Sequence, residues 1–361
     1  MSVKQIVLRG APYERGLSYG RTCRDEILIS LDSYRRLFRK ERNVTWEQAR
    51  AIAGRFLSYI EGRYDAYLAE MRGIAEGAGL EFEDILALNC RTEILYSAVK
   101  GTEKSPDECS AFSAVAPAAR PGSVLAGQTW DYTVAQREAL IIARLPEEKD
   151  IPARLLFLEA GMIGGMGVNA AGLALTLNAL DTEGSAPGVP LRIRMRSVLD
   201  CRDINAAYIA AAGTPIPFAA SLIITHRDGV SLNLELDPSG CDVLIPEDGL
   251  LVHTNHFLGP RMVLTHPHDK LASTYCRLQT LKQSLKSRKD LSAGDIEEFF
   301  RDHRGIPVSV CRHCDPHLTG EDHLDDCQTN FAFVADLKKG IVRFVPGNPC
   351  EGDFVTLPVE L

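Results

Sequence analysis

Cys109 has the surroundings expected of a reactive thiol. It directly follows Glu108 and begins an alternating segment, 110–116, that predicts a strand. A Pro-Gly turn leads to a second predicted strand, 124–130, which is followed by Asp131. A thiol at the start of one strand of a hairpin, with a carboxylate at the end of the partner strand, indicates a nucleophile held at a sheet edge.

A cut in the chain directly before Cys109 would give this residue a second reactive group. Its α-amino group would then be free, and such groups titrate at about 7.7–8.0, so that at neutral pH a useful fraction is able to accept the thiol proton. The thiolate would attack an acyl carbonyl and form a thioester, which water or an amine resolves. One residue would thus supply both the nucleophile and the base.

Asn255 is a candidate for stabilising negative charge. It follows a predicted apolar strand, 249–252, and an amide N–H at such a place can stabilise the oxyanion of a tetrahedral intermediate. His253 and His256 flank it in the sequence. Either imidazole would be the base in an alternative enzyme, an unprocessed Cys–His hydrolase.

A second group of chemically active side chains lies between Cys311 and Cys327. Its three thiols and three imidazoles are Cys311, His313, Cys314, His317, His323 and Cys327. Four of them would suffice to bind Zn²⁺ tetrahedrally, and the first two thiols have the Cys-x2-Cys spacing of a zinc knuckle, whereas the other residues have no standard spacing. This leaves a non-enzymatic alternative, a zinc-stabilised binding or scaffold protein in which Cys109 is structural. The favoured, enzymatic interpretation assigns no metal and no other cofactor.

Predicted helices precede the reactive cysteine, and mainly predicted strands follow it. The helical patterns cover 13–42, 45–59, 65–78 and 83–96, and later 192–201, 204–212, 269–287 and 292–303. The strand patterns cover 110–116, 124–130, 139–145, 154–159, 166–169, 173–178, 219–225, 230–236, 249–252, 328–336 and 340–345. The polar, aperiodic segment 99–107 is typical of a linker or processing loop. Because runs of strands are interrupted by pairs of helices, without strict βαβ alternation, we expect a layered α+β fold and not a doubly wound sheet.

Composition and charge exclude some classes of partner. The net charge is −8, and no Lys/Arg-rich run provides the electrostatic footprint of a nucleic-acid-binding protein. No apolar stretch is long enough to span a bilayer, and the first residues lack the apolar core of a secretory signal, so we expect no membrane partner and a cytoplasmic location. In that compartment most of the 10 cysteines would be reduced.

Several short motifs resemble one known family. The sequences Asp107-Glu108-Cys109-Ser110 and Gly127-Gln128-Thr129-Trp130-Asp131 are similar to those of the acyl-coenzyme A:6-aminopenicillanic acid acyltransferase family, which belongs to the autoproteolytic N-terminal nucleophile hydrolases. Further similar segments follow in the family's order at 72–79, 86–89, 164–169, 175–178, 252–256 and 347–350. The joint order of these motifs, more than any one of them, carries the resemblance.

The resemblance implies a fold, a processing event and a reaction. It implies a four-layer αββα sandwich, and a precursor cut between Glu108 and Cys109 into a small helical chain, 1–108, and a catalytic chain, 109–361. The two chains would stay associated as one structural unit, and a homo-oligomer is compatible with this arrangement. The activity implied is hydrolysis or transfer of the acyl group of a small-molecule amide or thioester, such as an acyl-CoA.

The resemblance also assigns roles to site residues. Cys109 would be the nucleophile, Asn255 the oxyanion donor, and Asp131 a neighbour of Cys109 that assists self-cleavage or holds the amino group. Glu108 departs from the family pattern, because many members have Gly there, where a strained backbone assists the N-to-S acyl shift. The family also uses a basic residue that no position of this sequence identifies, and the role is not assigned to Arg312.

Overall fold

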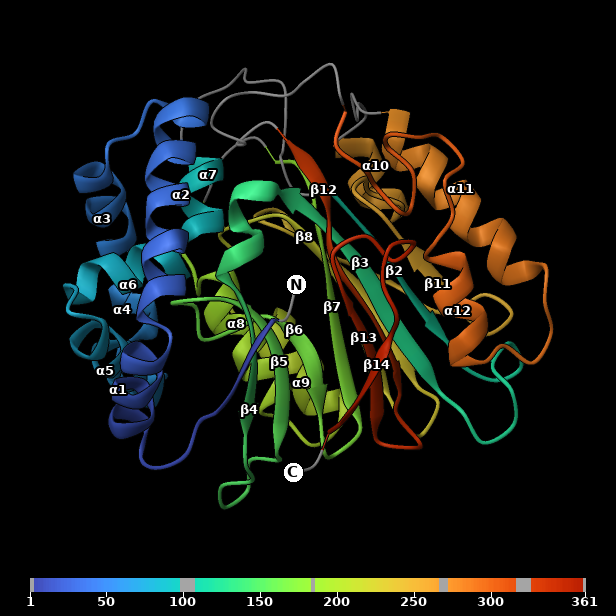
Figure 1. Ribbon diagram of the computed structural model, residues 1–361, viewed down its shortest axis with the longest axis horizontal. Coiled ribbons are helices and arrows are strands. Elements are labelled where there is room, and N and C mark those ends of the chain that lie inside the picture. The colour runs from blue at the N-terminus through green and yellow to red at the C-terminus, as the bar shows by residue number, and fades with distance from the viewer. Residues whose placement is uncertain (1–2, 98–107, 183–185, 266–271, 316–325, 360–361) are drawn as a thin grey trace.

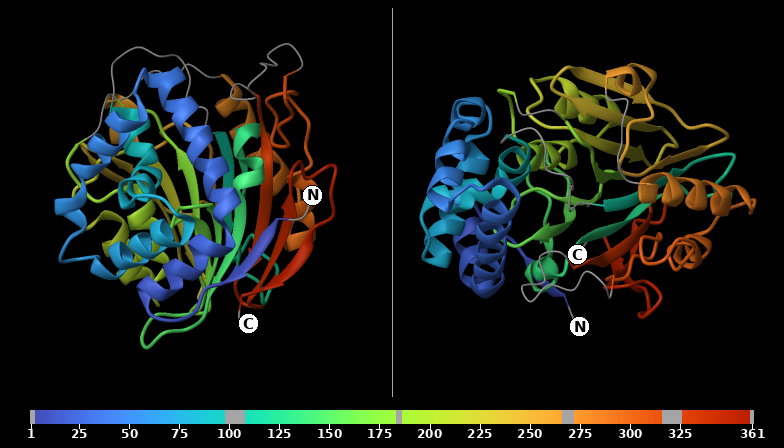
Figure 2. Two further views of the ribbon diagram at one scale, coloured as in Figure 1. Left: turned by 60° about the vertical axis from the view of Figure 1, so that its left-hand side comes forward. Right: turned by 90° about the horizontal axis from the view of Figure 1, so that it is seen from above.

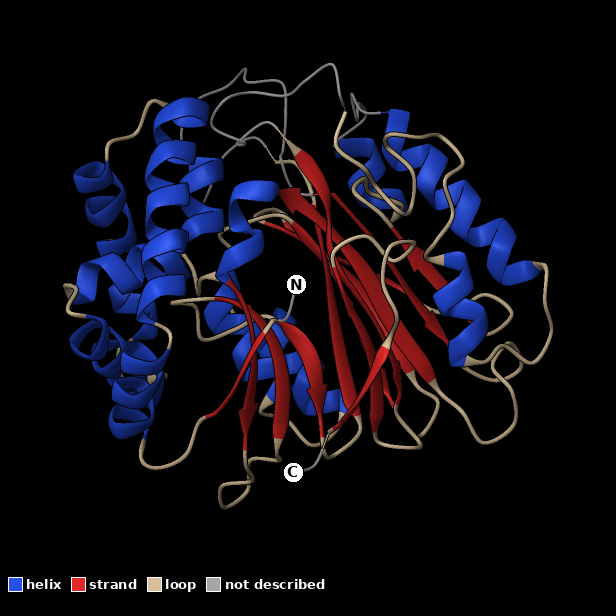
Figure 3. Cartoon of the chain, viewed as in Figure 1, coloured by secondary structure: helices blue, strands red, loops and turns tan. Residues whose placement is uncertain are grey.

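The protein is built from two β-sheets packed face to face, with helices on both outer faces (Figures 1 and 3). The structure is a computed structural model, whose described residues are 3–97, 108–182, 186–265, 272–315 and 326–359. The four layers, seen from two further directions in Figure 2, form the αββα sandwich and α+β fold predicted from the sequence.

One sheet has eight strands within the described residues, in the order β1-β4-β5-β6-β7-β8-β9-β10. Their bounds are Lys4–Val7, Leu140–Leu145, Arg154–Glu159, Met166–Asn169, Leu173–Ala179, Ala220–His226, Ser231–Asp237 and Gly240–Leu244. The N-terminal β1 pairs in parallel with β4, and the other neighbours are antiparallel. The segment before Cys109 therefore contributes an edge strand to this sheet as well as helices.

The other sheet carries the candidate nucleophile. Over the described residues it has six strands in the order β11-β2-β3-β12-β13-β14, all antiparallel. Their bounds in that order are Leu250–His253, Glu108–Ala114, Leu125–Thr133, Cys327–Asp336, Ile341–Pro346 and Val355–Pro358. The predicted hairpin of Cys109 is β2 and β3, near the middle of this sheet.

Helices form the two outer layers (Figure 1). On the side of the eight-stranded sheet lie α1 to α7, with bounds Pro12–Thr22, Arg24–Arg42, Trp46–Gly54, Leu57–Ile60, Asp65–Ala78, Phe82–Asn89 and Arg91–Ser97, together with α8 (Leu191–Leu199) and α9 (Ile204–Ala212). On the side of the six-stranded sheet lie α10 (Pro260–Thr265), α11 (Ala272–Lys286) and α12 (Ala293–Phe299). A 3₁₀ helix, Val134–Ala139, connects β3 to β4.

Alternation along β12 shows how the layers are held together. Phe331 and Phe333 face the other sheet, and their ring centroids lie 5.5 and 4.8 Å from that of Phe157 on β5. Ala332 and Val334 point to the opposite face and pack in a second core with apolar residues of α11 and α12. Because successive side chains of a strand point to opposite faces, one strand contributes to both cores.

A close helix contact lies in the first outer layer. Gly16 and Gly20 of α1 face Gly73 and Gly77 of α5. A Cβ atom at Gly16 would lie 2.0 Å from a backbone oxygen of α5, and one at Gly73 would lie 2.1 Å from a backbone oxygen of α1. Any side chain at these positions would force the two helices apart, so the glycines set the spacing of the layer.

Several predicted elements have the bounds expected, and the differences have physical reasons. The helix predicted over 13–42 is two helices, α1 and α2, which meet at Cys23. The strands β1, β10 and β14 were not predicted. They are edge or near-edge strands with mostly exposed or half-buried side chains, so they lack the apolar run by which a strand is identified. Among the described residues, no helix is both long and apolar enough to cross a membrane.

Candidate active site

Cys109 lies in β2, between β11 and β3, and is only 1% exposed. The odd-numbered residues of β2 face the other sheet, as the packing of Ala111 against Ile223 of β8 shows. The even-numbered Phe112 packs instead against Phe300, at the helical side, with ring centroids 5.8 Å apart. The thiol of Cys109 therefore belongs to the space between the sheets, whereas its neighbours in sequence face α11.

The backbone nitrogen of Cys109 donates a hydrogen bond to Oδ1 of Asn255, at 2.8 Å. Nδ2 of Asn255 donates to the backbone oxygen of Ala179 at 3.0 Å, and the backbone N–H of Asn255 donates to Thr274 Oγ1 at 2.7 Å. These donors and acceptors fix the orientation of the amide. The predicted proximity of Cys109 and Asn255 is present, with the amide oxygen directed at the nitrogen that self-cleavage would release.

Arg277 of α11 contributes to this site and was not predicted from the sequence. Nη1 donates to the backbone oxygen of Cys109 at 2.6 Å and to Ser110 Oγ at 3.1 Å. Nη2 donates to Asn255 Oδ1 at 2.9 Å and to Glu108 Oε2 at 3.1 Å. One buried guanidinium thus contacts three consecutive residues of β2 and the amide of Asn255, which only a planar, multiply donating group can do.

Asn178 of β7 holds the same carbonyl from the other sheet. Its Nδ2 donates to the backbone oxygen of Cys109 at 3.0 Å and to that of His253 at 3.4 Å. The Cys109 carbonyl is therefore bound from both sides, by Arg277 and by Asn178. Asn178 was part of a segment that resembled the family, but no role was predicted for it.

The carboxylate of Glu108 is surrounded by positive charge. Its Oε2 lies 3.1 Å from Arg277 Nη2 and 2.5 Å from Arg312 Nη1, and it accepts from Ser273 Oγ at 3.2 Å. Burial alone would raise the pKa of Glu108, but the two guanidinium groups outweigh burial and lower it. Arg312, to which no role was assigned from the sequence, binds the residue before the predicted cleavage site. Glu108 lies in an extended strand, outside the left-handed backbone region.

Asp131 pairs with Glu108 across the hairpin, whereas Cys109 pairs with Trp130. Directly opposed residues share one face of a sheet, so the carboxyl of Asp131 lies with Glu108 on the side of α11, and the thiol of Cys109 lies on the other side. Asp131 Oδ1 accepts a hydrogen bond of 2.7 Å from Thr329 Oγ1. Burial raises the pKa of Asp131 to about 7, against the opposing effects of Arg277 and Thr329.

The two candidate histidines have other partners. His253 is fully buried, with Nε2 2.6 Å from Glu235 Oε1 and Nδ1 2.7 Å from the backbone oxygen of Thr254. His256 Nδ1 lies 2.8 Å from Thr274 Oγ1, and burial lowers the pKa of its imidazole to about 4. Both rings thus connect β11 and the segment after it to neighbouring elements.

The predicted group of thiols and imidazoles is only partly brought together. Cys311 and His313 lie side by side, with Sγ and Nε2 3.7 Å apart. Cys314 Sγ instead donates to Gln328 Oε1 at 3.5 Å. His317 and His323 lie outside the described residues.

The comparison with family models decides the relationship of this chain. Residues 119–348 match the family described as acyl-coenzyme A:6-aminopenicillanic acid acyl-transferase. The chain belongs to this family. The resemblance predicted from the short motifs is confirmed, and the matched region, which begins after Cys109, includes Asp131 and Asn255. Membership supports an enzyme of acyl transfer and amide hydrolysis over the binding or scaffold alternative.

One curated relative and two solved structures illustrate the similarity of this chain to known proteins. The acyl-coenzyme A:6-aminopenicillanic-acid-acyltransferase 40 kDa form of Emericella nidulans is 28% identical over 312 residues, which cover 85% of this chain and 84% of that protein. Penicillin V acylase from Agrobacterium tumefaciens superposes with a TM-score of 0.43 and 13% identity, over 66% of this chain and 83% of its own. A mutant of conjugated bile acid hydrolase from Clostridium perfringens superposes with a TM-score of 0.46 and 14% identity, over 68% of this chain and 96% of its own.

Proposed function

We propose that this protein is an autoprocessing, cysteine-dependent amidohydrolase or acyltransferase, cut between Glu108 and Cys109. The mature nucleophile is the Cys109 thiol, and the base is the α-amino group that the cut releases. The substrate we propose is a small-molecule acyl amide or an acyl-CoA, in keeping with the name of the Emericella nidulans relative. The cytoplasmic location stays a prediction from the sequence.

The observation that carries the proposal is the set of side-chain hydrogen bonds to the backbone of Cys109. Its nitrogen is bonded to Asn255, and its carbonyl oxygen to both Arg277 and Asn178. These three side chains come from separate elements. The register of β11 with β2 ends at the pair His253–Ala111, so these side chains, and not a strand neighbour, bind the backbone of Cys109 on that side. A nucleophile whose own nitrogen is the base must be held at both of these atoms.

Self-cleavage would proceed by an acyl shift. The Cys109 sulfur attacks the carbonyl carbon of Glu108, the carbon–nitrogen bond to Cys109 breaks, and the proton that the thiol gives up passes to the nitrogen, which becomes the α-amino group. Water then hydrolyses the thioester, which leaves a carboxylate on Glu108 and restores the thiol. In this step Arg277 and Arg312 hold the side chain of Glu108, and Asn255 Oδ1 holds the departing nitrogen.

The mature reaction uses the same groups on a substrate. The α-amino group takes the thiol proton, the thiolate forms a thioester with the acyl group, and water or an amine resolves it. Asn255 acts on the amine through Oδ1, and stabilises the oxyanion through Nδ2 once that group turns from the carbonyl of Ala179. Asp131, which shares the α11 side with Glu108, orients the α-amino group and not the thiol.

Burial of Cys109 fits a precursor. In the uncut chain its side chain is 1% exposed, so a substrate acyl group has no access to the thiol. Cleavage would free the chain end before β2 and thereby open the space between the sheets to substrate. The uncut protein is on this view inactive towards small molecules.

Denaturing mass spectrometry tests the proposal. Purified protein should give two masses, corresponding to residues 1–108 and 109–361. Cys109→Ala should give one intact mass and no hydrolysis of N-acylated amines or thioesters. The matched control is Cys276→Ala, which removes an exposed thiol from α11 and should be cut and active. An intact wild-type chain with amidase activity would refute the self-base mechanism, and activity in Cys109→Ala would refute the assignment of the nucleophile.

A further inference from the structure

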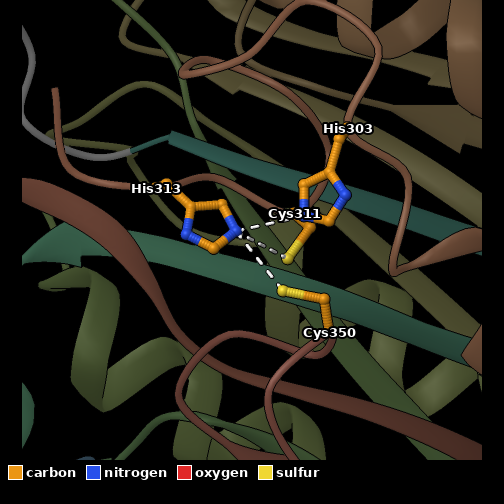
Figure 4. A group of neighbouring side chains, drawn as sticks. All are labelled: His303, Cys311, His313 and Cys350. Carbon is orange, nitrogen blue, oxygen red and sulfur yellow. Dashed lines mark hydrogen bonds between the residues drawn. The ribbon is translucent and has the colours of Figure 1, made fainter.

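Four side chains converge on one point beside the loop that follows α12. They are His303, Cys311, His313 and Cys350, and one ligand atom from each lies within 4.8 Å of the others (Figure 4). Two of them, Cys311 and His313, belong to the group noted in the sequence. Of the other two, His303 lies in the loop that follows α12, and Cys350 lies in the turn after β13.

We propose that these four residues form a structural Zn²⁺ site. Two thiolates and two imidazoles are a common ligand set for tetrahedral zinc. Tetrahedral zinc, with Zn–N of about 2.05 Å and Zn–S of about 2.3 Å, places two nitrogens about 3.3 Å apart and a nitrogen and a sulfur about 3.6 Å apart.

The distances between the ligand atoms fit these values. His303 Nε2 and His313 Nε2 are 3.1 Å apart. From His313 Nε2, the Sγ atom of Cys311 lies at 3.7 Å and that of Cys350 at 3.4 Å. A single ring nitrogen carries at most one proton, so it cannot satisfy three such neighbours by hydrogen bonds. A cation at their centre binds all four atoms.

The surroundings supply the contacts that zinc ligands usually have. Nδ1 of His313, the ring nitrogen turned away from the cluster, lies 3.8 Å from Glu351 Oε1, which is within ion-pair distance but longer than a hydrogen bond; a carboxylate near this nitrogen is common where histidine binds zinc. Cys311 Sγ accepts from Asn348 Nδ2 at 3.9 Å. Such partners orient zinc ligands and tune their charge.

Backbone hydrogen bonds fix the shape of the loop that carries the ligands. The backbone N–H of Cys311 donates to Asp302 O at 3.0 Å, and that of His313 donates to Pro307 O at 3.1 Å. Asn348 Nδ2 also donates to Arg312 O at 2.5 Å, which ties the turn of Cys350 to this loop. Zinc would therefore close a site whose ligands are in place, and with four protein ligands the site is structural and not catalytic.

Metal analysis of the full-length protein, purified without chelators, tests the proposal. We expect about one zinc per chain, and the same content in Cys109→Ala, so that the result does not depend on the proposed self-cleavage. His303→Gln and Cys350→Ser each replace an exposed ligand, so the fold should persist. Each should raise the zinc Kd about tenfold or more, because even second-sphere changes cost that much. Cys314→Ser is the matched control and should keep the wild-type Kd.

A cobalt titration keeps the proposal open to refutation if a variant folds poorly. The metal-free wild-type protein, titrated with cobalt chloride, should develop the strong visible bands of tetrahedral Co²⁺ and a near-ultraviolet thiolate charge-transfer band. The proposal is overturned if the protein binds neither zinc nor cobalt, if the cobalt spectrum is weak and octahedral, or if Cys314→Ser loses zinc as Cys350→Ser does. A Cys311–Cys350 disulfide in non-reducing peptide maps would also overturn it.

Discussion

Among the described residues, two of the buried clusters of arginines and carboxylates differ in how their charges are distributed. The first lies between α1, α5 and α8. In it Arg15 and Arg196 bind Glu70, at 2.7 and 3.4 Å, and Arg154 and Arg196 bind Asp200, at 2.5 and 3.1 Å. Each carboxylate is shared by two guanidinium groups, and the pKa of Asp200 is lowered, because its arginines outweigh the effect of burial.

The second cluster, around Cys109, has two arginines and two carboxylates, but its contacts are uneven. Arg277 and Arg312 both bind Glu108. Asp131 accepts from the hydroxyl of Thr329, and burial raises its pKa to about 7. The same residue types therefore make a balanced structural cluster in one place and a carboxyl poised near neutrality in the other. Departure of Glu108 after cleavage would leave both arginines to Asp131, and its pKa would then fall.

The largest expected effect is on self-cleavage and comes from a substitution in the second cluster, around Cys109. Arg277→Met removes one of the two side-chain donors to the Cys109 carbonyl and one of the two cations at Glu108. Because these contacts position the thiol's own residue and the residue it attacks, we expect self-cleavage to slow by about 100-fold or more. Arg277→Lys keeps the charge but not the planar fork, and should recover only part of the rate. The measurement is the time course of fragment formation after purification or refolding. An unchanged time course in Arg277→Met would show that the contacts are only structural.

A substitution in the first cluster, around Glu70 and Asp200, should lower the stability of the protein and leave self-cleavage unchanged. Arg196→Met leaves Glu70 and Asp200 each with one guanidinium fewer, and breaking a buried ion pair typically costs about 3–5 kcal/mol. Urea unfolding in the Cys109→Ala background should show this loss. The folded fraction of Arg196→Met with Cys109 intact should cleave at the wild-type rate. A selective loss of cleavage would contradict the separation of the two clusters.

Asp131→Asn should change the pH dependence of stability. The pKa of Asp131 in the folded protein, about 7, lies above its ordinary value of 3.8, so the folded state holds the proton more tightly. Between these two pH values the wild-type protein loses stability as the pH rises, and Asn does not. Relative to wild type, Asp131→Asn should therefore gain on the order of 3 kcal/mol between pH 4 and pH 8. Urea midpoints at pH 4.5, 6 and 8, in the Cys109→Ala background, measure it; a constant difference would exclude a raised pKa.

The smallest effect is expected from an exposed arginine with two carboxylate partners. Arg288 lies 2.5 Å from Asp295 Oδ1 and 2.9 Å from Glu298 Oε2 on the surface. Water and salt screen such pairs. Arg288→Ala should leave the urea midpoint and the cleavage rate unchanged within error. A clear change in the urea midpoint or the cleavage rate would mean that burial does not explain why the two clusters contribute more than a surface ion pair.

The sequence predicted the parts of the site that local patterns encode. Cys109 and Asn255 follow from strand edges and short motifs, and the structure brings Asn255 to the nitrogen of Cys109. Arg277 was missed because it lies inside a regular helical pattern, where nothing in the spacing marks it. Its contact with β2 arises only when α11 packs on the six-stranded sheet.

The sequence patterns also could not predict which way a side chain points or which residues far apart in the sequence come together. Asp131 was predicted to lie near Cys109; the register pairs it with Glu108, the preceding residue, so its carboxyl and the Cys109 thiol lie on opposite faces of the sheet. The proposed metal ligands were only half found, because Cys350 approaches Cys311 across the hairpin of β12 and β13. A lone distant cysteine carries no spacing signal.

The pairing of β1 with β4 has a consequence for the protein after processing. If the chain is cut at Glu108, β1 becomes a separate polypeptide's strand, added in parallel to the edge of the catalytic chain's sheet. Without it, the buried β4 would present a row of unpaired amide and carbonyl groups, a template for aggregation. The small fragment would therefore protect the edge of this sheet for the lifetime of the processed protein. Residues 1–108 and 109–361 expressed together as two polypeptides should assemble, and 109–361 expressed alone should be insoluble.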